Sequence, residues 1–175
     1  MRKSKMTITI LGCIGVFLIA ALLLIPAAQA GEKTMKYNYT SQVTKLEYIL
    51  FPDVKGHVLG VIEKRGVAIF ENEVAALDTL LTFDTIKKQG PWEGYSQITF
   101  KDGSTFTQKF QGATTFANGE KLTKGKGKYI KGTGRFEGIK GEFSFTGREI
   151  TPYTKDKTKG DNWGEGTGTY TLPKK

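Results

Sequence analysis

The chain has 175 residues, a formal charge of +9 and a single cysteine, Cys13. One cysteine cannot form a disulfide within the chain or a cysteine-based zinc cluster. No Walker, G-x-S-x-G or H-E-x-x-H sequence is present, so NTP-dependent, serine-hydrolase and zinc-protease chemistry have no support.

Residues 1–30 have the layout of a secretory signal peptide. Basic residues precede an uncharged apolar run from Ile8 to Ile25, Pro26 interrupts that run, and Ala28-Gln29-Ala30 supplies the small residues that a signal peptidase needs. Two alternatives stay open. A run of about 18 apolar residues is near the minimum for an uncleaved membrane anchor, and the residues up to Cys13 loosely resemble a lipobox.

Cleavage after Ala30 would leave residues 31–175 as a single domain that is exported to the periplasm or secreted. The mature domain would lose Cys13 and carry 23 basic and 17 acidic side chains. Export argues against nucleic acid as a partner and limits membrane contact to the export step.

A soluble cationic surface explains the lysines; attraction to acidic polymers or an anionic membrane is the alternative. The densest group comprises Lys121, Lys124, Lys126, Lys128 and Lys131.

Beyond residue 30 the sequence pattern is almost entirely that of β-strands. The best helix candidate is Asn72 to Leu81, but its continuation to Ile86 is rich in β-branched and aromatic residues and favours a strand from Leu77. Asp102-Gly103 predicts a two-residue hairpin with a type I′ turn. Strands are predicted over Thr34–Thr40, Thr44–Phe51, His57–Phe70, Leu77–Ile86, Trp92–Lys101, Thr105–Phe110, Lys126–Ile130, Gly134–Glu137, Glu142–Ile150 and Gly164–Leu172.

These short, closely spaced strands predict an antiparallel sandwich or a closed barrel. Seven glycines between Gly125 and Gly147 favour the barrel, because glycine suits strands that must bend sharply or approach another backbone closely. A barrel of about eight strands either fills with side chains or holds one small ligand.

The segment from Tyr129 to Gly141, YIKGTGRFEGIKG, resembles the G-T-G-x-F-x-x-x-x-G segment of the allene oxide cyclase-like barrels, and plant dirigent proteins carry a similar one. The resemblance is good from Gly125 to Ile150. It implies an all-β fold, a closed antiparallel barrel of about eight strands that would follow a signal-peptide helix. Allene oxide cyclases steer the ring closure of a fatty-acid epoxide, and dirigent proteins steer the coupling of phenolic intermediates. The chain does not match the catalytic motifs of either family, so no catalytic residue is assigned.

The predicted interior face supplies the candidate ligand-binding residues. Gln108 has the parity of its aromatic neighbours and suits the orientation of a ligand by hydrogen bonds, and Glu149 has the parity of Phe143 and Phe145. His57, the only histidine, is a candidate general base, but one histidine without cysteine does not make a zinc site. We expect no metal and no cofactor. The candidates are Tyr48, Phe83, Phe106, Gln108, Phe110, Phe143, Phe145, Glu149 and Tyr170.

Three functions are compatible with these patterns. The first is a barrel that binds a small apolar or amphipathic molecule without catalysis. The second is a cyclase-like or isomerase-like enzyme acting on an oxidised lipid or a phenolic compound. The third is a structural or assembly protein with a solidly packed barrel. Dimers and trimers are known among the proteins that the chain resembles, so a homo-oligomer is compatible with all three.

Overall fold

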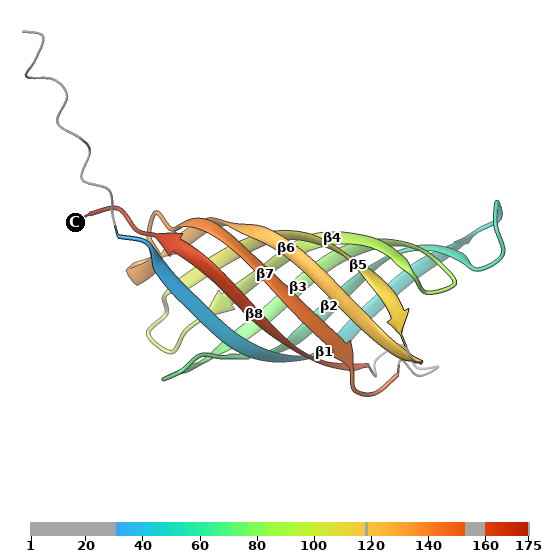
Figure 1. Cartoon of the computed structure of the whole chain (residues 1–175), viewed down its shortest axis with the longest axis horizontal. Helices are drawn as coiled ribbons and strands as arrows, with labels where there is room; N and C mark the ends of the chain where they lie inside the picture. Colours follow the sequence, from blue (N-terminus) through green and yellow to red (C-terminus); the bar gives the residue numbers. More distant parts are fainter. Residues whose placement is uncertain (1–30, 118, 153–159, 175) are drawn as a thin grey trace, which may run out of the picture. The chain divides into compact units, whose positions relative to one another are not determined.

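The structure, a computed structural model, describes residues 31–117, 119–152 and 160–174, which form one closed β-barrel (Figure 1). Each strand pairs antiparallel with the next, and the last pairs with the first. The predicted all-β closed barrel of about eight strands is therefore confirmed. The strands are β1 (Lys33–Phe51), β2 (His57–Ile69), β3 (Val74–Ile86), β4 (Gly90–Thr99), β5 (Thr105–Ala117), β6 (Glu120–Thr133), β7 (Lys140–Glu149) and β8 (Asp161–Thr171).

The predicted signal peptide lies outside the described residues, so its cleavage and the division into residues 1–30 and 31–175 stay predictions. Within the described ranges, no helix is long and apolar enough to cross a membrane.

Side chains alternate between the barrel interior and the solvent along each strand. In β4, Trp92 and Ile98 are buried while Glu93 and Tyr95 are exposed. The interior face of β6 carries glycines, and an added Cβ at Gly125 would lie 2.6 Å from the rings of both Trp92 and Phe145. Glycine is therefore needed on this strand because large aromatic rings from other strands lie against its backbone.

The two ends of the barrel differ. We name closed end the one that carries the β2–β3 and β4–β5 turns (70–73 and 100–104) and the 3-10 turn η2 (Gly134–Phe136) between β6 and β7. We name open end the one that carries the β1–β2 and β3–β4 turns (52–56 and 87–89). In a barrel whose strands run alternately up and down, these two sets of connections must lie at opposite ends.

Aromatic rings fill the interior at the closed end. Ring centroids lie 5.2 Å apart for Phe70 and Phe100, 5.0 Å for Phe100 and Phe136, and 5.1 Å for Phe106 and Phe136. Phe106 is completely buried. We call these four residues the aromatic plug; it closes this end of the barrel.

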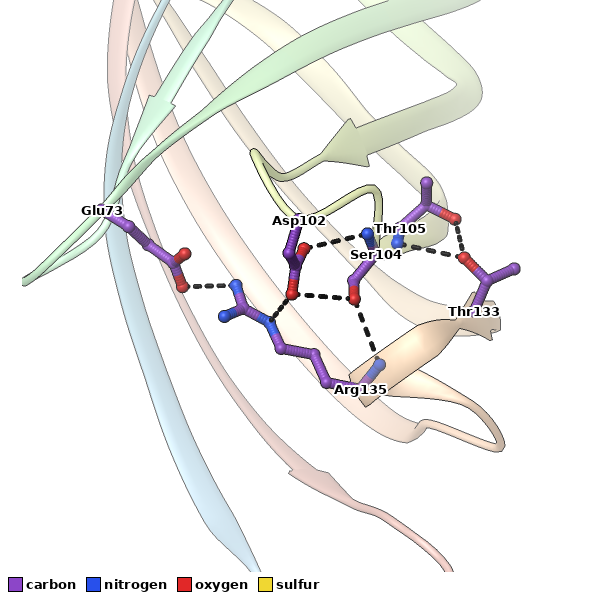
Figure 2. Close-up of polar contacts among 6 residues, drawn as sticks. All are labelled: Glu73, Asp102, Ser104, Thr105, Thr133 and Arg135. Atoms are coloured by element: carbon purple, nitrogen blue, oxygen red, sulfur yellow. Dashed lines mark hydrogen bonds and ion pairs between the residues drawn. The ribbon is translucent and has the colours of Figure 1, made fainter.

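A polar network holds the closed-end turns around the plug (Figure 2). Arg135 pairs with Glu73 and lies 3.7 Å from Asp102, and its guanidinium stacks 4.4 Å from the centroid of Phe100. The Ser104 amide donates to Asp102 (2.9 Å), and the Arg135 amide donates to the Ser104 hydroxyl (3.2 Å). The glycine-rich segment that carries the family resemblance therefore shapes this end of the barrel.

Some predicted element boundaries were wrong. Thr34–Thr40 and Thr44–Phe51 are one strand, β1, because a bulge between Val43 and Lys45 absorbs a residue without interrupting the ladder. The helix candidate Asn72 to Leu81 lies largely in β3, where hydrogen bonding to β2 and β4 overrides helix propensity. Gly134–Glu137 is not a strand, because Gly134 has φ +59° and begins η2.

The hairpin at Asp102-Gly103 is present, but its turn is not type I′. Of these two residues only Gly103 has a positive φ, 80°, and the loop between β4 and β5 is longer than two residues. The Asp102 side chain accepts the Ser104 amide, an Asx turn that stabilises the longer loop.

Candidate functional site

A cavity of about 810 Å³ occupies the part of the barrel nearer the open end. Its size falls in the range of roughly 300–1,000 Å³ that is usual for small-molecule sites. The turn residues Gly56, Lys87 and Lys88 border it, whereas no residue of the aromatic plug does. The described barrel is therefore filled at the closed end and hollow towards the open end.

An aromatic wall forms one side of the cavity. Trp92 lies between Phe110 and Phe145, with ring centroids 5.8 and 5.6 Å away, and Phe145 stacks on Phe143 at 5.9 Å. The Trp92 indole N–H donates to the Thr114 hydroxyl at 3.1 Å, so the indole is held in place and its polar atom is satisfied. This wall offers a flat apolar molecule several faces to stack against.

A polar band adjoins this wall on β4 and β5 and continues across β3 to β2. Lys64 of β2, Thr79 of β3, Ser96 of β4 and Gln108 of β5 are successive register partners, so their side chains lie in one row across four strands. The Thr79 and Ser96 hydroxyls are hydrogen-bonded at 2.8 Å, and the Gln108 amide donates to the Tyr37 hydroxyl at 3.4 Å. Burial raises the pKa of Tyr37 to about 12, so this hydroxyl stays neutral.

Lys64, Lys121 and Glu149 are among the ionisable groups that line the cavity. Lys121 of β6 and Glu149 of β7 form an ion pair at 3.1 Å, with about a fifth of each side chain exposed. Lys64 is half-buried, and its removal from solvent lowers its pKa to about 8. The nearby positive charge of Lys121 adds to this lowering, and Glu149 opposes it.

His57 links the β1–β2 turn to β3 at the open end. Its Nδ1 lies 2.6 Å from Asp53 of the β1–β2 turn, and its Nε2 lies 2.7 Å from Asp84 of β3. These hydrogen bonds raise the pKa of the imidazole and lower the pKa of Asp53. His57 does not line the cavity, so its position favours a structural role over that of a general base acting inside.

The β3–β4 turn at the cavity entrance is strained. Its two central residues, Lys87 and Lys88, have φ of 51° and 69°, a conformation that disfavours side chains with a Cβ. Ile86 and Gln89 exchange backbone hydrogen bonds across the turn, and the Lys87 amide donates to Gly56 at 2.9 Å. The chain thus presents two ammonium groups at the entrance in a turn that Asn-Gly would suit better.

Most of the ligand-binding candidates from the sequence meet at the cavity. Seven of them line it: Tyr48, Phe83, Gln108, Phe110, Phe143, Phe145 and Glu149. Phe106 belongs to the aromatic plug, and Tyr170 packs against the buried core. That any of them binds a ligand stays a prediction.

Sequence reasoning missed Lys64 and the inward position of Lys121. Lys64 has the parity of Ile62 and Ala68, which could have indicated an interior position. However, Val61 and Val67 make the other face of β2 equally apolar in sequence. The density of lysines on this segment suggests one exposed face, but the parity of Lys121 differs from that of Lys124, Lys126 and Lys128, which are exposed.

Comparison with known proteins gives structural similarity only. No family model and no curated protein matches the chain. A pterocarpan synthase dirigent protein is similar in structure with a TM-score of 0.48 and 10% identity, over 82% of this chain and 88% of that one. A conserved protein of unknown function from Rhodopseudomonas palustris has a TM-score of 0.49 and 9% identity, over 79% of this chain and 97% of that one. Similarity at this level bears on neither the activity nor the ligand of the chain.

The closed antiparallel barrel of eight strands is the architecture that the sequence resemblance implied.

Proposed function

We propose that this chain is an exported barrel that binds one small amphipathic molecule in its interior. The observation that carries the proposal is the cavity of about 810 Å³, which joins an aromatic wall to a band of hydrogen-bonding groups. A molecule with an apolar body and one polar function would satisfy both surfaces at once. The alternative of a barrel packed solidly along its whole length does not fit such a cavity.

The proposal that the protein is exported rests on residues 1–30 and not on the barrel. We expect the protein recovered from the periplasm or the medium to begin at Gly31, which N-terminal sequencing would show. Retention of residues 1–30 in a membrane fraction would instead support the anchor.

Filling the cavity tests the binding proposal. Leu81 faces the cavity and its neighbour Leu80 faces the solvent with about half of its side chain exposed. We expect Leu81→Trp to reduce the uptake of the fluorescent probe N-phenyl-1-naphthylamine by about tenfold or more, because the indole occupies the space that the probe needs. Leu80→Trp is the matched control and should bind as the unmodified chain does. Equal binding by both variants, or no uptake by the unmodified chain, would refute an interior site.

A cyclase-like or isomerase-like enzyme is the second candidate. Lys64 and Glu149 favour it, because ionisable groups against an apolar wall are typical of sites that move protons. Conversion of an oxidised fatty acid or a phenolic compound, lost in Lys64→Met, would favour this candidate over binding alone.

A further inference from the structure

Lys64 and Lys121 both line the cavity but differ in their surroundings. Lys121 is paired with Glu149, whereas the Lys64 ammonium has, among the described residues, neither a carboxylate within ion-pair distance nor a hydrogen-bond acceptor. Its nitrogen is not sealed inside the wall but faces the cavity space. An ammonium in this position has no carboxylate within ion-pair distance and is incompletely hydrated, so the neutral form of the amine is more populated than that of a fully solvated lysine.

A neutral amine is a nucleophile, whereas an ammonium is not. Lysines become reactive towards carbonyl compounds when they are desolvated in an apolar pocket or placed near another cation. Lys64 meets both conditions, because it is enclosed by the barrel and is influenced by the charge of Lys121. The Lys121–Glu149 pair keeps one cation and one anion near it, so protons can be exchanged within the cavity.

The cavity also suits the molecule that such an amine would attack. Lys64 begins the polar band and pairs in register with Thr79, whose hydroxyl is bonded to Ser96. One of these two hydroxyls donates to the other, which keeps its own hydrogen to donate to a carbonyl oxygen. The aromatic wall, with Trp92 between Phe110 and Phe145, can hold an apolar substituent.

We propose that Lys64 forms a reversible imine with an apolar aldehyde or ketone held in the cavity. This inference rests on the proposed binding function and names the chemical class of its ligand. The Lys64 nitrogen forms a bond to the carbonyl carbon, the carbonyl π bond breaks, and the oxygen becomes a hydroxyl by taking up the proton that the nitrogen loses. The carbon–oxygen bond then breaks, the two hydrogens of the neutral amine leave with the oxygen as water, and a carbon–nitrogen double bond remains. No oxidant or reductant takes part.

Reductive trapping tests this step on the full chain. The exported protein is treated with a limiting amount of decanal and cyanoborohydride, which reduces an imine to a stable decylamine, and the modified lysines are located by peptide mass spectrometry. We expect Lys64 to be modified about tenfold faster than Lys126, an exposed lysine on the outer face of β6, because more of the Lys64 amine is neutral. Decanol, which has the same chain but no carbonyl group, should protect Lys64 and leave Lys126 unaffected.

Two variants serve as a matched pair. Lys64→Arg keeps the positive charge but cannot form the imine, so the fast modification should disappear, whereas Lys126→Arg should leave it unchanged. Modification spread evenly over the lysines of the unmodified chain, or unprotected by decanol at Lys64, would overturn the inference even if Lys64→Arg failed to fold.

Binding of decanol separates the two proposals. If decanol displaces the naphthylamine probe while Lys64 is not preferentially modified, the imine is refuted and the binding barrel stands. If neither decanol nor the probe binds, the proposed function itself fails.

Discussion

Lys64 and Arg65 are adjacent in β2 and carry the same charge, yet their environments are opposite. Arg65 faces the solvent, where it lies 3.6 Å from Asp78, and Lys64 faces the cavity. The difference follows from strand geometry, since successive side chains point to opposite sides of a sheet. Alternation identified Gln108 and Glu149 correctly as inward-facing, because their strands have one clearly apolar side. It could not identify Lys64, because Val61, Val67 and Ile69 on the solvent side of β2 are exposed apolar residues.

The two hydrogen bonds of His57 predict how stability depends on pH. Its pKa is raised in the folded chain, so protonation stabilises the fold fully below the unfolded value of about 6.5, and this contribution is lost as pH rises through the folded pKa. The lowered pKa of Asp53 affects stability at acid pH. The ionised carboxylate stabilises the fold above about pH 3.8, and this stabilisation is lost as pH falls through the pKa of the folded state.

Thermal unfolding of the unmodified chain and of His57→Gln, measured between about pH 5 and pH 8, tests this prediction. The unmodified chain should be the more stable at the acid side of this range, and the difference between the two midpoints should shrink as pH rises. Both proteins contain Lys64, whose lowered pKa increases stability only as pH rises towards and above about 8, so its contribution cancels in this comparison. A difference that does not change with pH would contradict a stabilising imidazolium.

At the scale of the element, periodicity located most of the strands but not all of their ends. Two predicted strands form the single strand β1 because a bulge lies between Val43 and Lys45. After this bulge, the alternate set of side chains faces the barrel interior. Sequence alternation alone cannot show such a change, because an extra residue resembles a break in the pattern. The η2 turn was similarly hidden, since its single positive φ at Gly134 lies within a glycine-rich segment.

The β3–β4 turn carries a prediction about stability. Replacing Lys87-Lys88 by Asn-Gly should raise the free energy of unfolding by about 1–2 kcal/mol, because both positions have positive φ and these residues adopt it at lower cost. Urea denaturation should show a higher midpoint with an unchanged slope. Lys101→Asn in the β4–β5 turn is the control: Lys101 does not have a positive φ, so this change should bring no comparable gain. No gain from Asn-Gly would show that the turn is not strained.

At the scale of the whole molecule, the barrel divides stability and binding between its two ends. The aromatic plug buries large rings at the closed end, whereas the rings around the cavity contact empty space on one side. Removing a fully enclosed ring costs more free energy than removing one that borders a void, because fewer contacts are lost in the second case.

Phe106→Ala and Phe83→Ala separate these two contributions. Phe106 is completely buried in the plug, so its loss should lower the free energy of unfolding by about 3–5 kcal/mol and leave probe binding little changed. Phe83 borders the cavity and is only partly buried, so its loss should cost less stability but weaken probe binding. Chemical denaturation and probe titration of both variants measure the two effects. If both variants lost similar amounts of stability and of probe binding, the division between a packed end and a binding end would be contradicted.

The amino-acid sequence by itself determined the all-β class and most of the aromatic interior, and it favoured a closed barrel over a sandwich, because period-two alternation and strand glycines are local features of the chain. Only the tertiary structure decided which interior residues are packed and which line a cavity. Phe106 and Phe110 have the same parity, but depth along the barrel places one in the plug and the other at the ligand-sized space. Pairing across strands also brought Lys64, Lys121 and Glu149, from β2, β6 and β7, into the same electrostatic environment.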